Sequence, residues 1–180
     1  MIYSLIKRNF GVHVLINYYM SSKENLIGLD KKKSEDLSAE LNVLLANYQI
    51  FYQNLRGLHW NIRGKNFFEL HLKFEELYND ALVKIDEIAE RILTLGHTPL
   101  HSFSDYIAAS EIKESKNISE DKKAVELVLK NLSVLIKRER TILAISDKAD
   151  DEGTNSLVSD YIQQQEKIIW MLSSWLNVEK

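Results

Sequence analysis

The chain of 180 residues contains no cysteine, a single proline (Pro99) and only six glycines. Without cysteine it can form neither disulfides, iron–sulfur clusters nor thiolate zinc sites, which fits a reducing cytoplasm. A β-rich or loop-rich fold would need more proline and glycine for its turns. Hydrophobic residues make up 45% and charged residues 27%. The composition therefore predicts one soluble, mainly helical domain.

Charge is unevenly distributed along the sequence. Residues 1–33 include six basic and two acidic residues, a balance of +4, so the rest of the chain carries −7. We interpret 1–33 as a flexible, solvated tail. Residues 1–20 combine a basic pair with a short apolar run, but no small-x-small cleavage site follows, and the apolar run is too short to span a bilayer. We interpret 1–20 as a translated upstream stretch with Met20 as the start; an ordered extra helix is the alternative.

Apolar residues recur every three or four positions, which is typical of amphipathic helices. Ser34 is the expected N-cap of the first helix. The pattern predicts four long helices, over about 34–64, from just after Gly64 to Leu95, over 119–149 and over 155–176. The long connection 97–118 has room for a short helix over 104–110. A crossover between the second and third long helices predicts an all-α, ferritin-like four-helix bundle over 34–177.

The second predicted helix carries two pairs of residues that can bind metal, His71 with Glu75 and Asp86 with Glu90. Each pair is spaced i, i+4, so its members lie one turn apart on one face. At roughly 100° per residue, all four fall within an arc of about 100°. Three apolar residues share this face: Leu82, Ala89 and Leu93.

His71 and Asp86 lie fifteen residues apart, roughly 22 Å along a helix axis at 1.5 Å per residue. The two pairs therefore cannot bind one metal ion within a single subunit. If two copies of this helix packed antiparallel about a two-fold axis, each His71–Glu75 pair would meet the Asp86–Glu90 pair of the other copy. The apolar stripe is typical of such an interface. His59, at the end of the first helix, could complete the nitrogen ligation.

Two histidines and up to three carboxylates form a mixed ligand set that suits iron, manganese or zinc. Carboxylates also offset the charge of Fe(III) after oxidation. An i, i+4 His–Glu pair is also common on solvated helix faces, so this alternative stays open for the residues taken alone. Di-iron enzymes with a site inside one bundle use Glu-x-x-His on two helices. None of the five histidines here follows a glutamate at that spacing, which disfavours an intra-bundle di-iron enzyme.

Several sequence pieces between Asn54 and Leu95 follow one another in an order that is specific to one family. They are Leu58-His59-Trp60-Asn61 with Gly64, Asn66-Phe67-Phe68-Glu69-Leu70-His71, Phe74-Glu75-Glu76-Leu77-Tyr78 and Ile85-Asp86-Glu87-Ile88-Ala89-Glu90-Arg91. In these pieces the sequence resembles the Dps family of mini-ferritins. The helix pattern extends the resemblance over roughly residues 34–177.

The resemblance implies a ferroxidase site of two histidines, two aspartates and a glutamate, divided between subunits. By position, the histidines correspond to His59 and His71, the second aspartate to Asp86 and the glutamate to Glu90. The first aspartate corresponds to Glu75, a departure that keeps the charge and adds one methylene. We expect the iron site to be retained, with either one or two iron ions. Glu75 would bind directly or through water. Zinc or another divalent metal could substitute for iron.

The resemblance also implies a cytoplasmic homododecameric shell. Fe(II) would be oxidised at the dimer interface, preferably by hydrogen peroxide, and ferric mineral would collect inside. Trp60, next to His59, would either pass an electron or quench a radical, or serve only in packing. An acidic turn lies where the family places its three-fold pores, and its carboxylates would attract cations: Asp147, Asp150, Asp151 and Glu152.

Two other functions stay open. Lys31, Lys32 and Lys33, repeated over a shell, could bind the phosphates of DNA through multivalency and counterion release. The acidic body of the protein opposes DNA binding, and 177–180 is not a basic tail. The remaining alternative is a bundle with a purely structural or interaction role and a degenerate site. The sequence does not predict a partner membrane.

Overall fold

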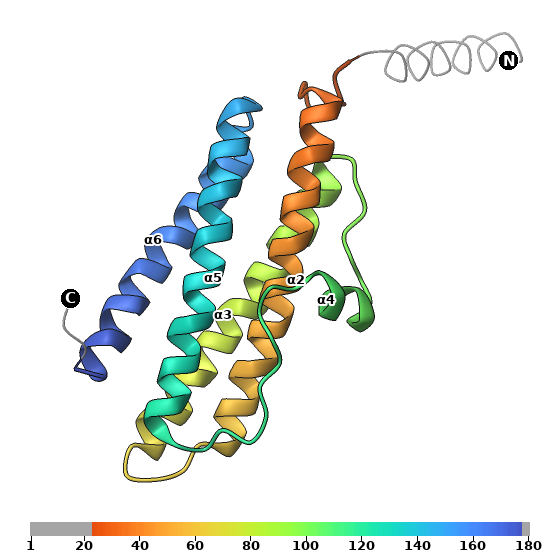
Figure 1. Cartoon of the computed structure of the whole chain (residues 1–180). Helices are drawn as coiled ribbons and strands as arrows, with labels where there is room; N and C mark the ends of the chain where they lie inside the picture. The colour runs from red at the N-terminus through yellow and green to blue at the C-terminus, as the bar shows by residue number, and fades with distance from the viewer. Residues whose placement is uncertain (1–22, 178–180) are drawn as a thin grey trace, which may run out of the picture.

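The computed structural model describes residues 23–177, and every regular element within them is an α-helix (Figure 1). The elements are α2 (Lys31–Asn61), α3 (Phe67–Thr94), α4 (Phe103–Ala109), α5 (Asp121–Lys148) and α6 (Glu152–Trp175). The predicted all-α fold, with four long helices and one short helix in the crossover, is confirmed. None of the helices in the described part of the chain is long and apolar enough to cross a membrane.

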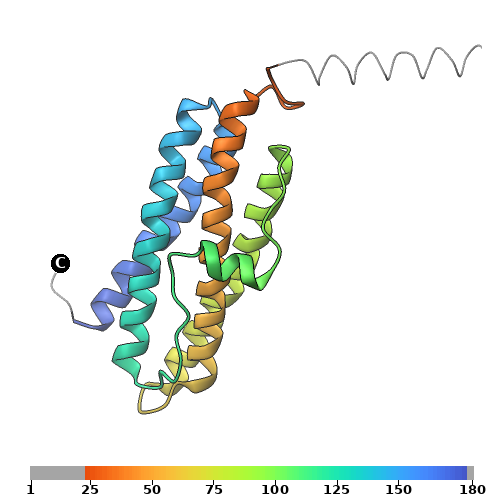
Figure 2. The same ribbon diagram turned by 45° about the vertical axis from the view of Figure 1, so that its right-hand side comes forward.

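The link between α3 and α5 decides the topology of the bundle. After α3 ends, the chain turns back, forms α4 beside α2, and reaches the opposite end of the bundle before α5 begins (Figures 1 and 2). As a result α3 and α5 run in the same direction, whereas α2 and α6 run in the other (Figure 1). Helix α2 packs against α3, α4 and α5, and α5 packs against α6. This is the ferritin-like arrangement.

Two asparagines of α2 hold the crossover against the bundle. The Oδ1 atom of buried Asn47 accepts hydrogen bonds from the backbone N–H groups of Glu111 at 2.8 Å and Ile112 at 3.1 Å. Asn54 donates to the carbonyl of Lys113 at 3.0 Å and accepts from the N–H of Ser115 at 2.9 Å. These contacts satisfy backbone groups of a segment that has no regular structure of its own.

The start of α2 differs from the sequence prediction. The helix begins at Lys31, and Asp30 is its N-cap because its side chain accepts from the N–H of Lys33 at 2.9 Å. Ser34 is buried within the helix, so its prediction as the N-cap is wrong. Asn25 contacts the Ser34 hydroxyl at 3.3 Å. Lys31, Lys32 and Lys33 of the predicted tail are therefore part of α2, and the predictions for 1–20 lie outside the described residues.

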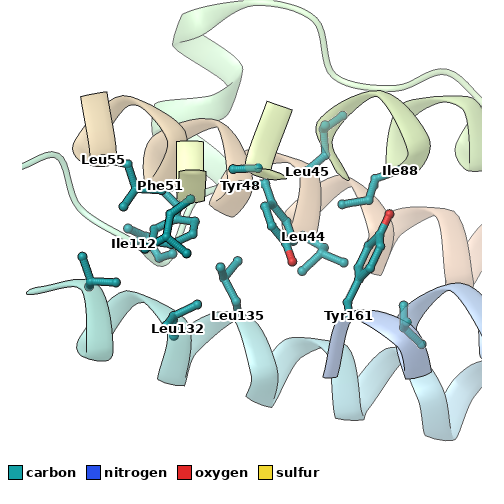
Figure 3. Packing of buried hydrophobic residues seen from close by; sticks show 14 of the residues in the cluster. Leu44, Leu45, Tyr48, Phe51, Leu55, Ile88, Ile112, Leu132, Leu135 and Tyr161 are labelled. Atoms are coloured by element: carbon teal, nitrogen blue, oxygen red, sulfur yellow. The ribbon is translucent and has the colours of Figure 1, made fainter. Parts of the chain in front are cut away.

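One hydrophobic core fills the bundle. In Figure 3, Tyr48 and Phe51 of α2 face Leu135 of α5, and Ile112 of the crossover packs beside Phe51. Tyr161 of α6 lies next to Tyr48, with ring centroids 6.1 Å apart. Each fully buried large apolar side chain contributes roughly 1.5–3 kcal/mol relative to an exposed one. This core fixes the helices that carry the candidate site.

Candidate metal centre

Two histidines from different helices lie side by side at one end of the bundle. His59 is in the last turn of α2 and His71 is near the start of α3. The turn between the helices includes Gly64 at φ 110°, a backbone conformation that suits glycine. The two imidazole rings stack with centroids 3.7 Å apart and an interplanar angle of 20°. The fold thus brings together the two predicted nitrogen ligands.

Reciprocal hydrogen bonds orient both imidazoles. The Nδ1 atom of His59 lies 2.8 Å from the carbonyl oxygen of His71, and Nδ1 of His71 lies 2.9 Å from the carbonyl oxygen of His59. A carbonyl only accepts, so each Nδ1 carries the proton. In a neutral imidazole this leaves the lone pair on Nε2, the form in which histidine binds metals. Such outer hydrogen bonds fix the tautomer and the ring orientation of a metal-binding histidine.

Glu75 adds a carboxylate to the histidine pair. One ligand atom from each of His59, His71 and Glu75 lies within 4.8 Å of the others, and all three residues are half-buried. The Tyr78 hydroxyl donates to Glu75 Oε1 at 3.4 Å, and the Tyr78 ring meets His59 edge to face at 5.4 Å. Loss of water and the charge of Glu75 raise the pKa of Tyr78. Tyr78 therefore remains a neutral hydrogen-bond donor behind the cluster.

The other two predicted ligands lie further along α3. Asp86 and Glu90 are exposed, and neither joins the metal-ligand cluster of residues 23–177. Their carboxylates form no hydrogen bond or ion pair within that part of the chain. In a single subunit the Asp86–Glu90 pair therefore lies apart from the His59–His71–Glu75 cluster, at the distance along α3 that the helical spacing predicts.

Large apolar side chains share the exposed face of α3 with these ligands. Leu72, Leu82 and Leu93 are 63%, 50% and 59% exposed. Ala89, predicted for the same stripe, is half-buried and packs against the core. Exposed leucines interleaved with ligand-type residues are typical of a surface that is covered in an assembly.

Comparisons with known proteins agree with this architecture. The model of the ferritin-like domain family matches residues 38–180. The DNA protection during starvation protein of Porphyromonas gingivalis is 40% identical over 148 residues, which cover 82% of this chain and 93% of that protein. The chain belongs to the Dps family, within the ferritin-like superfamily.

Solved structures give the same result. The Dps protein of Vibrio cholerae O1, described as a member of a broad superfamily of ferritin-like diiron-carboxylate proteins, is 52% identical with a TM-score of 0.85. The match covers 87% of this chain and 98% of that one. The Dps protein of Bacillus brevis is 33% identical with a TM-score of 0.78, covering 81% and 97% of the two chains.

Trp60 of this Dps-family chain lies next to the histidine pair and is 57% exposed. The Arg56 guanidinium sits 4.6 Å from the centre of the Trp60 ring and 5.4 Å from that of Tyr52. Tyr52 in turn meets Tyr78 edge to face at 6.1 Å. Arg56, Tyr52 and Tyr78 were not among the site residues predicted from the sequence. The helical spacing of Tyr78, three residues after Glu75, was the available signal.

The acidic turn between α5 and α6 divides into exposed and buried carboxylates. Asp147, Asp150 and Glu152 are exposed. Asp151 is only 2% exposed; it accepts from Arg91 at 2.5 Å and caps α6 by accepting from the N–H of Thr154 at 3.0 Å. The prediction of Asp151 as a pore residue is therefore wrong, because its carboxylate is already engaged within the subunit.

Proposed function

We propose that this Dps-family protein is a ferroxidase that oxidises Fe(II), preferably with hydrogen peroxide, and stores the ferric product. The observation that carries the proposal is the oriented histidine pair, whose Nε2 atoms remain available beside the Glu75 carboxylate. A structural or solvated His–Glu pair would not need both imidazoles fixed in the same metal-binding tautomer.

The site is completed by a second copy of the chain. Asp86 and Glu90 lie on the same exposed face of α3 as the histidine pair but too far along the helix to reach it. An antiparallel pairing of two α3 helices about a two-fold axis would bring these carboxylates to the histidines of the other copy, and each dimer would then contain two equivalent sites. Exposed Leu82 and Leu93 would pack against the second copy between the two sites.

The donor set fits Fe(II) as the substrate. Imidazole nitrogens and carboxylate oxygens suit iron, and zinc or another divalent cation would bind the same atoms. His59 and His71 would act as neutral ligands, and Glu75 as an anionic ligand. Asp86 and Glu90 of the second copy would add the negative charge that balances Fe(III).

Two iron ions at neighbouring positions allow a balanced reaction. Each Fe(II) gives one electron to the same hydrogen peroxide, whose O–O bond breaks to give two hydroxide ions. Two protons from solution convert these ions to two molecules of water. Peroxide is then reduced in a two-electron process without release of hydroxyl radical. Exposed Trp60 can supply an electron if a lone iron ion reacts, or it can serve only in packing at the interface.

Storage requires an enclosed space, which we propose is a dodecameric shell in the cytoplasm. The exposed carboxylates of Asp147, Asp150 and Glu152 would gather around three-fold pores. Clustered carboxylates attract cations and would raise the local concentration of Fe(II) at the entrance.

Peroxide-dependent oxidation of Fe(II) tests the function directly. We expect the double variant His59→Ala with Asp86→Ala to lose the ferric absorbance change, because one ligand is removed from each half-site. His101→Ala, an exposed histidine in the crossover, is the matched control and should keep the parental rate. A double variant as fast as the parent would refute the site. Native mass spectrometry should give twelve subunits; a monomer would refute the shared site.

DNA binding is the second candidate, favoured by relatives that are named for DNA protection. The lysines predicted to contact DNA are partly engaged within the subunit. Lys32 pairs with Glu35 at 3.2 Å and with Asp36 at 2.8 Å, and Lys33 donates to the carbonyl of Lys148 at 2.7 Å. Gel retardation in low salt tests this candidate, and no shift even there would exclude it.

A further inference from the structure

A second polar cluster lies in the centre of the bundle, away from the histidine pair. Tyr48 reaches from α2 toward α5 (Figure 3), and its hydroxyl donates to Glu139 Oε1 at 2.8 Å. Gln165 of α6 donates to the same carboxylate oxygen at 2.5 Å and to the Tyr48 oxygen at 2.8 Å. The exposed fractions are 1% for Tyr48, 0% for Glu139 and 3% for Gln165.

Two buried oxygens of this cluster have no donor among residues 23–177: Glu139 Oε2 and Gln165 Oε1. An unsatisfied buried polar atom costs about 1–3 kcal/mol, so native cores rarely leave one without a partner. Both atoms are acceptors when Glu139 is ionised. The cluster is therefore suited to a positively charged or donating group.

Lys84 of α3 places a buried ammonium group beside Tyr161, whose ring packs against Tyr48 of this cluster. The residue is 3% exposed, and its Nζ bonds to Asp80 and, at 2.8 Å, to Gln164. Nζ also lies 5.2 Å from the centre of the Tyr161 ring, which meets Tyr48 edge to face. Lys84 is thus held between α3 and α6 by half-buried Asp80 and exposed Gln164, beside the cluster but not in contact with its unpaired oxygens.

The charge of Lys84 acts on Glu139. Burial raises the pKa of Glu139 to about 7. The hydrogen bonds from Tyr48 and Gln165 oppose this rise, and the charges of Lys84 and Arg140 do so to a smaller extent. Glu139 forms no ion pair at contact distance with any residue of 23–177. Lys84 therefore serves as a counter-charge across the bundle rather than as a direct partner.

Other ferritin-like bundles build metal sites from carboxylates on facing helices in the bundle core. Here α5 still supplies Glu139, but α3 supplies an ammonium group. We propose that Lys84 is a specificity-determining residue whose positive charge beside the bundle centre keeps divalent metal ions from binding at Glu139. This inference rests on the proposed function, because it confines iron to the sites shared between subunits.

Removal of the ammonium group should turn the cluster into a metal site. Lys84→Ala would remove the positive charge and the bulk of the side chain while leaving the unpaired oxygens of Glu139 and Gln165. Asp80 would also lose its ion-pair partner. A set of oxygen ligands suits Mn²⁺, and the paramagnetic resonance signal of free Mn²⁺ gives a direct count of bound ions.

The test uses the assembled protein with the shared sites removed by His59→Ala and Asp86→Ala. In this background we expect no tightly bound Mn²⁺ in the bundle centre while Lys84 is present. Adding Lys84→Ala should introduce about one Mn²⁺ per subunit, and adding Glu139→Gln to that protein should remove it. Lys73→Ala, which removes a more exposed lysine of the same helix, is the control and should add no Mn²⁺.

If the protein with Lys84→Ala is folded and assembled but binds no more Mn²⁺ than the background, the inference is wrong. If it fails to assemble, refolding is repeated with Mn²⁺ present. Recovery of the assembled protein in Mn²⁺ but not in its absence supports the site, whereas no recovery overturns it. Both readouts are independent of iron oxidation, so they separate this inference from the proposed function.

Discussion

The two polar clusters of the subunit differ in what completes them. The histidine cluster is half-buried, and its ligand atoms come from helices α2 and α3. The Glu139 cluster is closed, with side chains from three long helices meeting in the core. Catalytic metal sites keep an open coordination position, and only the histidine cluster meets that condition. Carboxylates alone therefore do not identify a metal site. Solvent access to the ligand atoms and the charge of the neighbouring side chains decide whether a cluster binds metal.

The largest expected effect comes from dividing the shared site between two variants. One carries His59→Ala and His71→Ala, and the other carries Asp86→Ala and Glu90→Ala. Each alone should lose peroxide-dependent oxidation by about 100-fold or more, since disturbing even an outer partner of a ligand costs 10–100-fold. When the two are refolded together, random pairing should restore about a quarter of the parental rate, because half of the dimers are mixed and each mixed dimer has one intact site.

Refolding each variant with the parent protein controls for assembly. Failure of the two variants to restore activity together, when both assemble with the parent, would contradict a site divided between subunits. Activity retained by either variant alone would contradict the ligand assignment itself.

Most of the histidine cluster could be predicted from the sequence because helical spacing places His71, Glu75, Asp86 and Glu90 on one face. The sequence also indicated that one subunit could not complete the site. It could not predict the reciprocal Nδ1 hydrogen bonds, which depend on the geometry of the turn at Gly64 and on backbone atoms of both helices.

The second prediction concerns the closed cluster and pH. The folded pKa of Glu139 is about 7, above its ordinary value of 4.5, so the folded protein holds a proton that the unfolded chain releases over this range. The contribution of Glu139 to stability should therefore fall by about 3 kcal/mol as pH rises from 4.5 to 7, and the loss should then level off. Glu139→Gln remains neutral and should lack this loss. Chemical denaturation at several pH values measures the difference between the two proteins.

Glu139→Gln should keep its iron oxidation rate, because the bundle centre is separate from the shared site. If the free energy of unfolding changed with pH in the same way in the parent and in the variant, Glu139 would not titrate in this range. A large loss of oxidation in a correctly assembled variant would contradict the separation of the two clusters.

The Glu139 cluster could not be predicted because its members lie far apart in the sequence. Tyr48 and Gln165 are separated by 117 residues, and Tyr48 and Glu139 by 91. The apolar periodicity places each of these three residues on the core-facing side of its helix. In the sequence, a glutamate at such a position looks like an isolated polar residue and does not indicate a cluster. The role of Asp151 was missed for a different reason. The resemblance to the family suggested a pore at the acidic turn, whereas Asp151 and Thr154, three residues later, together form a helix cap.

A smaller effect is expected when the departure at Glu75 is reversed. Glu75→Asp shortens the side chain by one methylene and withdraws the carboxylate from Tyr78, which contacts it at 3.4 Å. We expect the affinity for Zn²⁺, measured by calorimetry on the assembled protein, to weaken about tenfold. This is the lower end of the loss of about 10–100-fold that follows when the surroundings of a metal ligand are disturbed. Glu76→Asp changes the adjacent exposed carboxylate and is the control. An unchanged affinity for Glu75→Asp would mean that Glu75 does not contact the metal directly.

The smallest expected effect tests whether Arg91 fixes the acidic turn as rigidly as the core fixes Glu139. A Cβ at Gly153 would lie 3.0 Å from Nη1 and 3.1 Å from Cζ of Arg91, and Arg91 is held by Asp151 and Thr154. Gly153→Ala should therefore destabilise the protein by about 1 kcal/mol despite the higher helix propensity of alanine. In a background with Arg91→Ala the same change should become stabilising by a similar amount, because the close contact is gone and only the propensity remains. A stabilising Gly153→Ala in the parent would mean that the guanidinium moves freely and that the turn is not fixed by Arg91.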